Sequence, residues 1–313
     1  PPPPSPPFHG KPKPAGTPAN AHNANEQLCG AVYAELYMLD DGAKNRSMLA
    51  DTERVLGEEI ADPTSQSLWS WVDALHMAMS TYSRMGNATG DPRYWEQQWR
   101  MFNFSSLSGC PGNRSCVRHP AACDGFCFWN ASDSLFYRDD NYVQSRVYWG
   151  RGNGWAIAAL VSAIEYGRAD PHRESYVAIF KQLATKLGRI QSADGAWRTS
   201  LLNATGFPVP ETTGTANFAY GLAYGINAGL LPSGTFLPVV QKAWHWLATV
   251  ALQPGGQVSF CQPGGSHPMG MTDRYGGNKA CWANGVCTNT SNFCVGQFLL
   301  AASQVSRLSA ALA

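Results

Sequence analysis

The sequence has few charged residues and no long apolar run. Only 14% of its 313 residues are charged, the net charge is +1, and no basic patch stands out, so nucleic acid is not expected as a partner. No apolar segment approaches the roughly 20 residues that span a bilayer, so we expect no membrane partner either. No signal peptide opens the sequence, which is typical of a mature or trimmed chain.

Several common catalytic motifs are also missing. The sequence contains no Gly-x-Ser-x-Gly, no phosphate-binding loop, no dinucleotide fingerprint and no His-Glu-x-x-His. No two cysteines form a Cys-x-x-Cys pair, which makes a zinc site a poor second choice to disulfides. Alternation typical of β-strands is scarce as well, and residues 257–260 are the best short case.

Cysteines and N-glycosylation sequons, by contrast, are numerous. Nine cysteines occur, mostly within 110–127 and 261–294, which are rich in Gly, Pro and Asn. Their odd number leaves one free thiol, for which a buried Cys29 is the candidate, or a bridge to another chain. Seven sequons lie at Asn45, Asn87, Asn103, Asn113, Asn130, Asn203 and Asn289. Together these features predict a secreted or cell-wall-associated glycoprotein.

Residues 1–26 differ in composition from the rest. They begin Pro-Pro-Pro-Pro-Ser-Pro-Pro and continue with Lys-Pro-Lys-Pro, a composition that has little to bury and favours extended polyproline II. Two interpretations remain open: a disordered tail, and an extended arm through which the chain docks or self-associates. We expect residues 27–313 to form one domain.

That domain is predicted to be all-α. Apolar residues follow a helical stripe in three segments, one of which contains Tyr176, Phe180 and Leu183. Further helices are expected at about 27–39, 47–60, 70–86, 92–103, 216–229 and 293–307. Nine or ten helices separated by Gly/Pro/Asn loops favour helical hairpins arranged in a ring or a stack. In a ring, the loops at one end would converge on a central cleft.

One heptad carries the strongest functional signal, Trp149-Gly150-Arg151-Gly152-Asn153-Gly154-Trp155. Indole faces stack on sugar rings, arginine binds carboxylates in bidentate fashion, and glycine lets the backbone approach a ligand. These groups suit a ring that carries a carboxylate, such as a uronic acid. Asp139 lies just upstream, and an acid near a sugar platform is the minimum that a glycosidase needs. The alternative is a glycine-rich loop leading into a buried helix.

Asp73 is a second candidate acid, because it follows Trp69 and Trp71 closely. Partial desolvation by the indoles would raise the pKa of its carboxyl and help it act as an acid. The alternative is an aspartate stabilised by the dipole at a helix N-terminus. His76, expected on the same helix, is the one histidine that we place near the cleft.

Two further segments favour ligand binding. Residues 194–198 offer a second tryptophan–arginine pair, Trp197 and Arg198. Residues 208–215 form a polar loop framed by proline and glycine, and it contains Glu211. This glutamate would either contact sugar hydroxyls or hold an arginine in place, and the loop could also be merely a helix cap.

Four segments, taken in order, resemble glycoside hydrolase family 105, the unsaturated rhamnogalacturonyl hydrolases, and the related family 88, the unsaturated glucuronyl hydrolases. They are residues 71–77, 133–139, 149–155 and 210–215, and the resemblance covers about residues 25–307. It implies an (α/α)6 barrel with a central cleft and no metal or organic cofactor. Family members usually carry one more N-terminal hairpin, and here the proline-rich tail stands in its place, so we expect a barrel-like ring that lacks this hairpin.

The resemblance also implies an activity, which is removal of a 4,5-unsaturated uronic acid from the non-reducing end of lyase-derived oligosaccharides of the pectin or rhamnogalacturonan type. In that chemistry an aspartic acid protonates C4 of the enol ether, water adds at C5, and the resulting hemiketal opens. By position, Asp139 would be the proton donor and water activator, and Asp73 the second carboxylate. Arg151 and Arg198 would bind the uronate carboxylate, and Arg138, His76 and Glu211 would complete the site. The stacking walls would be Trp71, Trp149, Trp155 and Trp197.

An inactive family member remains the alternative. It would serve as an extracellular structural or glycan-binding subunit, for example of a filament, and would self-assemble through residues 1–26. The missing hairpin would leave apolar helix surface uncovered, which is typical of an interface. The Cys-rich segment 106–128 also lies close in sequence to the Asp139 loop, where it could narrow or block the cleft.

Overall fold

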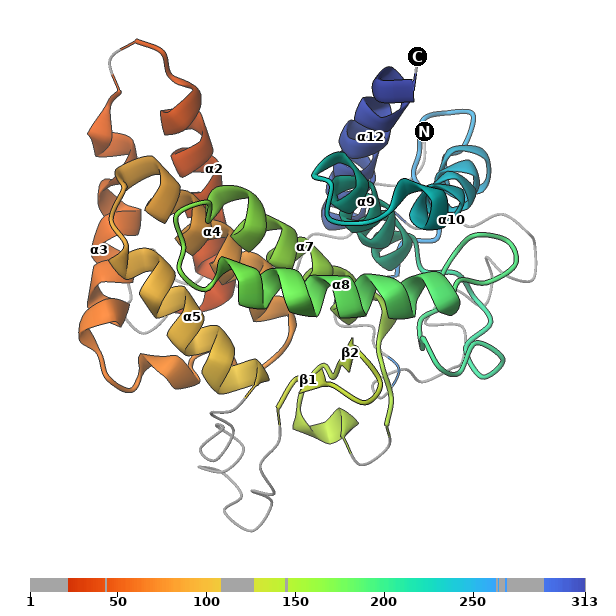
Figure 1. The fold of residues 1–313 in the computed structure, drawn as a ribbon, viewed down its shortest axis with the longest axis horizontal. Coiled ribbons are helices and arrows are strands. Elements are labelled where there is room, and N and C mark those ends of the chain that lie inside the picture. Colours follow the sequence, from red (N-terminus) through yellow and green to blue (C-terminus); the bar gives the residue numbers. More distant parts are fainter. Residues whose placement is uncertain are drawn as a thin grey trace, which may run out of the picture.

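Helical hairpins build the molecule. A computed structural model describes residues 22–42, 44–107, 127–143, 146–262, 264, 268 and 290–312. Five helices form an inner row in which each packs against the next: α2 (Ala24–Leu39), α4 (Asp73–Thr89), α7 (Gly150–Tyr166), α9 (Thr212–Asn227) and α12 (Asn292–Leu312). Four helices lie outside this row: α3 (Ala50–Ala61), α5 (Arg93–Ser106), α8 (Arg173–Arg189) and α10 (Ser233–Trp246) (Figure 1). The expectation of an all-α ring of hairpins is confirmed.

The central helices α7 and α9 are buried on almost every side. Residues 150–164 of α7 are buried without interruption, which explains why their sequence is apolar all round rather than on one face. Small residues let the two helices approach closely, because a Cβ on Gly221 would lie 2.6 Å from the Cδ1 atom of Ile157. The outer helix α8 instead buries one face, which includes Tyr176 and Phe180 of the predicted stripe as well as Val177 and Ile179. The core therefore follows the inner row.

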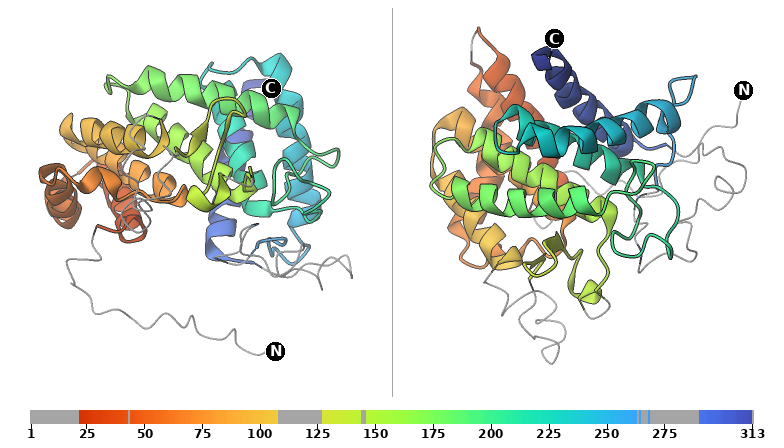
Figure 2. Two further views of the ribbon diagram at one scale, coloured as in Figure 1. Left: turned by 90° about the horizontal axis from the view of Figure 1, so that it is seen from below. Right: turned by 45° about the vertical axis from the view of Figure 1, so that its right-hand side comes forward.

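The inner row is open at its two ends, α2 and α12. Helix α2 exposes five large apolar side chains: Leu28, Val32, Tyr33, Leu36 and Leu39. Helix α12 exposes Leu299 and Leu300. The turned views in Figure 2 place α3 at one side of the molecule and α10 at the opposite side. Within the described residues, five inner helices thus form an incomplete ring of the six-hairpin type.

The expected helices all form, with shifts at their ends. The helix expected at 27–39 begins earlier, at Ala24, because the side chain of Asn23 accepts the N–H of Asn25 at 3.0 Å and caps it. The boundary expected between arm and domain therefore falls inside α2, and residues 1–21 of the arm lie outside the described residues. The helix expected at 47–60 is divided into a 3-10 turn, η1 (Arg46–Leu49), and α3. Gly90, whose φ is +72°, ends α4.

Residues 257–260, the best short case of strand-like alternation in the sequence, form no strand. This segment makes one isolated bridge, between Leu252 and Val258, and its extended course ends at Phe260, whose φ is +58°. The strands found in the described residues are β1 (Trp129–Asn130) and β2 (Leu135–Phe136), which pair antiparallel. They form a short hairpin directly before Asp139.

The described cysteines include one disulfide with both partners in view, between Cys261 and Cys294. It joins the segment that follows α10 to the start of α12. Cys127 is also disulfide-bonded. Cys29 is free, as expected, but it is exposed on α2 rather than buried. Five cysteines lie outside the described residues: Cys110, Cys116, Cys123, Cys281 and Cys287.

The sequon asparagines differ in exposure. Asn45, Asn87 and Asn203 are exposed, Asn103 and Asn130 are half-buried, and Asn113 and Asn289 lie outside the described residues. Among the described helices, none combines the length and the apolar composition needed to cross a bilayer.

Candidate active site

The loops around the N-terminal ends of α7 and α9 are joined by backbone hydrogen bonds. The N–H of Gly150, at the start of α7, donates to the carbonyl of Thr199 at 2.7 Å. The N–H of Glu211, just before α9, donates to the carbonyl of Trp197 at 3.1 Å. A Cβ on Gly150 would lie 2.5 Å from the carbonyl oxygen of Arg198, so only glycine fits at this contact. The starts of α7 and α9 are therefore fixed to each other through residues 197–199.

Asn153 positions the segment that carries Arg138 and Asp139. Its side chain is buried in the first turn of α7, where Oδ1 accepts the N–H of Phe136 at 2.7 Å and Nδ2 donates to the carbonyl of Phe136 at 2.9 Å. Two residues further on, the carbonyl of Arg138 accepts the N–H of Val72 at 2.8 Å. The two candidate acids, at positions 73 and 139, therefore lie on backbone segments that are hydrogen-bonded to each other.

A cavity of about 430 Å³ opens where these segments meet. Its volume lies within the range of roughly 300–1,000 Å³ that is typical of small-molecule sites. Six residues predicted for the site line it: Asp73, His76, Arg138, Trp149, Arg151 and Trp155. Its other lining residues are Asn25, Leu28, Met77, Gly264, Phe293, Gly296 and Gln297.

Asp73 is the first residue of α4, and its Oδ2 has no hydrogen-bond partner among the described residues. Burial within the cavity raises the pKa of this carboxyl. The positive charges of Arg138 and Arg151 act in the opposite direction, as does the N-terminus of the helix, but burial outweighs them. The surroundings of Asp73 thus favour the protonated form of its carboxyl more than water does.

Asp139 is held in a different way. Its Oδ1 accepts the backbone N–H of Asn141 at 3.0 Å, and its Oδ2 contacts the guanidinium of Arg138. Asp139 is buried and does not line the cavity, whereas Arg138 does, so the carboxylate stands behind the arginine. The negative charge of Asp139 nevertheless raises the pKa of Asp73. The two acids therefore interact electrostatically.

Arg151 is the most tightly held cation of the site, with 2% of its surface exposed. Its Nη1 donates to the carbonyl of Gln262 at 2.9 Å. The guanidinium carbon lies 4.6 Å from the ring centroid of Trp149 and 5.2 Å from that of Phe293. Two ring faces and a carbonyl thus fix a buried positive charge in the cavity wall.

Glu211 is the acid that pairs with this arginine. Its Oε1 lies 3.4 Å from Nη1 of Arg151, and its other oxygen accepts the N–H of Gly214, which caps α9. Glu211 is buried and does not line the cavity. Of the two roles expected for it, the structure shows the second, in which the glutamate holds an arginine in place.

The cavity is also lined by neutral polar groups. The ring of His76 stacks on that of Trp155 with 5.0 Å between the centroids. Burial and the charge of Arg84 lower the pKa of His76 to about 4, so this ring is neutral near pH 7. Neither Nδ1 of His76 nor Oε1 of Gln297 has a hydrogen-bond partner among the described residues. Both atoms can accept hydrogen bonds from a ligand.

Three residues predicted to bind the sugar lie elsewhere. Trp197 is fully buried, and its indole N–H donates to the carbonyl of Leu187 at 3.1 Å. Arg198 pairs with Asp194 at 2.9 Å. Trp71 packs on the core without lining the cavity. The expectation that Trp197 and Trp71 form stacking walls and that Arg198 binds the uronate is corrected, because packing and an ion pair occupy these groups.

Sequence reasoning missed the residues that α2 and α12 contribute. Phe293 and Gln297 are four residues apart on α12, and Asn25 and Leu28 are three apart on α2, so each pair shares one helix face. That spacing was visible, but it is equally typical of core residues. In the described part of the chain, no group of three or more His, Cys, Asp or Glu side chains is arranged to hold a metal ion.

Comparison with known proteins agrees with this arrangement. Residues 11–309 match the profile of Glycosyl Hydrolase Family 88. The unsaturated 3S-rhamnoglycuronyl hydrolase of Alteromonas sp. (strain LOR) is 31% identical over 234 residues, which are 70% of this chain and 50% of that protein. The chain thus spans half the length of this curated relative.

Two solved structures are similar as well. A glycosyl hydrolase family 88 protein from Bacteroides vulgatus has 30% sequence identity and a TM-score of 0.76, over 91% of this chain and 75% of that one. A protein described as a polysaccharide lyase has 31% identity and a TM-score of 0.74, over 91% of this chain and 73% of that one. The match to the family profile extends over nearly the whole sequence and confirms the resemblance seen in the motifs, so the chain belongs to Glycosyl Hydrolase Family 88.

Proposed function

We propose that this chain is a hydrolase that removes a 4,5-unsaturated uronic acid from the non-reducing end of lyase-derived oligosaccharides of the pectin or rhamnogalacturonan type. The family and the curated hydrolase that resembles the chain support this class of reaction. One observation carries the proposal, namely a single cavity lined by the Asp73 carboxyl, whose Oδ2 has no partner among the described residues, by the fixed guanidinium of Arg151 and by the indoles of Trp149 and Trp155.

The cavity suits an unsaturated uronate in both charge and shape. Arg138 and Arg151 supply positive charge for the sugar carboxylate. Trp149 and Trp155 supply apolar faces for a flattened sugar ring. Glu211 already neutralises part of the charge of Arg151 from behind, which keeps this guanidinium in place before the sugar binds.

The proposed reaction consumes one water molecule. A carboxylic acid gives its proton to C4 of the enol ether, and the electron pair of the C4–C5 double bond forms the new C–H bond. Water adds to C5 and loses a proton to a carboxylate, which restores the acid. The resulting hemiketal opens: the bond between C5 and the ring oxygen breaks, C5 becomes a ketone, and the ring oxygen stays on C1 as a hydroxyl. The hemiacetal formed at C1 then collapses to an aldehyde and releases the aglycone. Each step needs a proton donor and a proton acceptor near one sugar ring.

We assign proton donation and water activation to Asp139 and the second carboxyl role to Asp73. Arg138 lines the cavity and contacts Asp139, so an entering uronate competes for this guanidinium. A carboxylate that loses its cation beside a second carboxyl takes up a proton more readily. Asp73, in the cavity wall, would orient the sugar.

The test is the ultraviolet absorbance of the enol, which falls as the unsaturated sugar is hydrated. We expect the wild-type chain to lower this absorbance for at least one member of a panel of unsaturated uronyl disaccharides. Asp139→Asn and Asp73→Asn should each reduce kcat by about 10²–10⁴-fold. Asp194→Asn is the matched control, because Asp194 pairs with Arg198 away from the cavity, and it should leave kcat unchanged. A wild-type chain that leaves the whole panel intact would overturn the proposal.

The same assay separates a hydrolase from a lyase, which matters because one similar structure is described as a polysaccharide lyase. A lyase creates the conjugated double bond and raises the absorbance of a saturated uronate polymer. A hydrolase of the proposed type destroys this bond and lowers the absorbance of the lyase product. We expect only the second change.

We also propose that the protein is an extracellular glycoprotein. Asn45, Asn87 and Asn203 are exposed and accessible to the glycosylation machinery. Native protein should lose mass on treatment with an N-glycan-cleaving amidase, and peptide mapping should find the modification at these three positions. Unmodified asparagine at all three would contradict this part of the proposal.

The alternative of an inactive structural subunit is supported by the apolar stripe that α2 exposes. Val32 is 59% exposed and Leu39 66%, which is unusual for neighbouring residues on one helix face. Light scattering at several protein concentrations decides the point. A self-associating chain that leaves the disaccharide panel intact would favour the structural role, and an active monomer would exclude it.

A further inference from the structure

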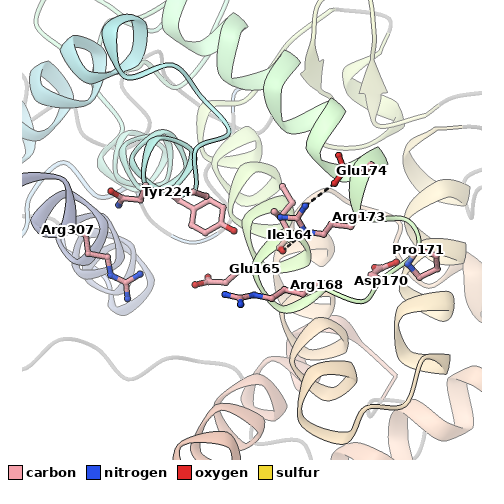
Figure 3. Close-up of a pocket in the computed structure, with 11 residues that line it drawn as sticks. Ile164, Glu165, Arg168, Asp170, Pro171, Arg173, Glu174, Tyr224 and Arg307 are labelled. Atoms are coloured by element: carbon pink, nitrogen blue, oxygen red, sulfur yellow. Dashed lines mark hydrogen bonds and ion pairs between the residues drawn. The ribbon is translucent and has the colours of Figure 1, made fainter. Parts of the chain in front are cut away.

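A second cavity, of about 670 Å³, lies near the C-terminal ends of the inner helices, whereas the candidate active site lies near the N-terminal ends of α4, α7 and α12. The second cavity is formed where α7, α9 and α12 approach their C-terminal ends and where α8 begins, and Figure 3 shows the residues that line it. It shares no residue with the cavity that contains Asp73. Its volume also falls within the range of roughly 300–1,000 Å³ that is typical of small-molecule sites.

The centre of this second cavity contains a carboxylate that no arginine reaches. Glu165 forms no hydrogen bond or ion pair with another residue in the described part of the chain. Burial raises its pKa, and the positive charges of Arg84, Arg307 and Arg168 act against that rise. Figure 3 shows Arg168 and Arg307 on either side of Glu165. The cations are close enough to influence the carboxylate, but space remains between them.

Most of the other ionisable groups of this cavity already have partners, and the exception is the buried Oδ2 atom of Asp170, which has none among the described residues. Arg173 donates to the carbonyl of Ile164 at 3.2 Å and to Glu174 at 2.9 Å. The Oδ1 atom of Asp170 accepts the backbone N–H of His172 at 2.7 Å. The groups left to meet a ligand therefore include Glu165, Arg168 and Arg307, together with the hydroxyl and ring of Tyr224, which Figure 3 shows pointing toward them.

These groups select a ligand that has both an anionic substituent and hydroxyl donors. A bare inorganic anion would satisfy Arg168 and Arg307, but it has no hydrogen-bond donor for Glu165 and would be repelled by this carboxylate. A neutral sugar would satisfy Glu165 and leave both guanidiniums without an anion. An acidic sugar offers a carboxylate to the arginines, hydroxyls to Glu165 and a ring face to Tyr224.

We propose that this cavity is a second carbohydrate site that binds one acidic sugar unit of a saturated uronate chain. Because it lies near the opposite ends of the inner helices, this site would keep a polymer attached to the protein while the cavity around Asp73 receives a chain end. The proposal does not depend on the proposed hydrolysis, because binding of a saturated oligosaccharide involves no turnover.

The experiment is isothermal titration of the whole chain with saturated trigalacturonate, with galactotriose and sodium sulfate as separate probes. Trigalacturonate should bind at least about tenfold more tightly than either probe, the difference that one charge-assisted hydrogen bond produces. The double variant Arg168→Ala/Arg307→Ala should weaken this binding by about tenfold or more. Because neither arginine has a hydrogen bond or ion pair among the described residues, the variant should keep the wild-type melting temperature.

A kinetic readout distinguishes the two cavities. Inhibition of disaccharide hydrolysis by trigalacturonate reports on the cavity around Asp73, and the double variant should leave both kcat and the inhibition constant unchanged. Binding of trigalacturonate that is equally tight in the double variant would overturn the proposal. Sulfate that binds as tightly as trigalacturonate would also overturn it, because the site would then be a simple anion site. A chain without hydrolytic activity would refute the proposed function and leave the titration decisive for this site.

Discussion

The buried ion pair between Arg151 and Glu211 offers the sharpest test of how the site is held together. The change is Glu211→Gln, which preserves the shape of the side chain and removes its charge. At 3.4 Å the two charges attract each other by about 5 kcal/mol if the effective dielectric constant is about 20. Loss of one partner from a buried pair typically costs about 3–5 kcal/mol, because the remaining charge stays buried.

Part of that cost is offset in this protein. The glutamine oxygen can still accept the N–H of Gly214 and keep the cap of α9, and Arg151 keeps the carbonyl of Gln262 and two ring faces. We therefore expect Glu211→Gln to lower the free energy of unfolding by about 2–4 kcal/mol. At about 2–4 °C per kcal/mol, the slope for domains of about 150–250 residues, the melting temperature should fall by about 4–16 °C.

Differential scanning calorimetry measures this change, and Glu174→Gln is the matched control. Glu174 also pairs with an arginine, Arg173 at 2.9 Å, but its side chain is 81% exposed, so its loss should cost less than about 0.5 kcal/mol. A Glu211→Gln variant that melts within one degree or so of the wild type, as the control should, would refute the claim that the pair fixes Arg151.

Three further changes test other parts of the account. Asp73→Asn should raise the melting temperature near pH 8 and leave it unchanged near pH 4, because a carboxyl whose pKa is raised by burial destabilises the fold only above its ordinary titration range. If the variant and the wild type have the same melting temperature at pH 8 as well as at pH 4, the raised pKa of Asp73 is contradicted. Cys261→Ser/Cys294→Ser should lower the free energy of unfolding by about 3–4 kcal/mol in guanidinium titrations, since the bridge closes a loop with a sequence separation of 33. Gly214→Ala should cost about 1–3 kcal/mol and reduce kcat, because the new Cβ would lie 3.1 Å from the backbone nitrogen of Arg151 and push α9 away from α7. Wild-type kcat in this variant would show that the site tolerates such a shift.

The sequence predicted the helices and the neighbourhood of the site well, for a physical reason. Burial imposes a helical period on the outer helix α8 and a nearly continuous apolar run on the inner helix α7. The heptad at 149–155 begins α7, where backbone bonds fix its place. Six of the predicted residues therefore line one cavity. The direction of a side chain in a loop has no such periodic signal. Trp197 turns into the core and Arg198 pairs locally, although their sequence looks like that of the heptad.

The sequence also could not predict how neighbouring residues divide their roles. Arg138 and Asp139 are adjacent, yet the arginine lines the cavity and the aspartate stands behind it. Phe293 and Gln297 enter the site from a helix that is distant in sequence, and only the folded structure shows that they line the same cavity as Asp73. Side-chain placement of this kind depends on tertiary packing and not on local pattern.

The most direct test of the central claim is proton nuclear magnetic resonance of the products formed in D₂O from an unsaturated uronyl disaccharide. Protonation at C4 from an acid in exchange with solvent predicts one deuterium at C4 of the released uronate, with loss of the vinyl proton signal. Asp139→Asn and Asp73→Asn should slow this incorporation, and Asp194→Asn should not. Release of a uronate that keeps its vinyl proton and carries no deuterium at C4 would contradict the account, because the bond to the aglycone would then have been cleaved without hydration of the enol ether.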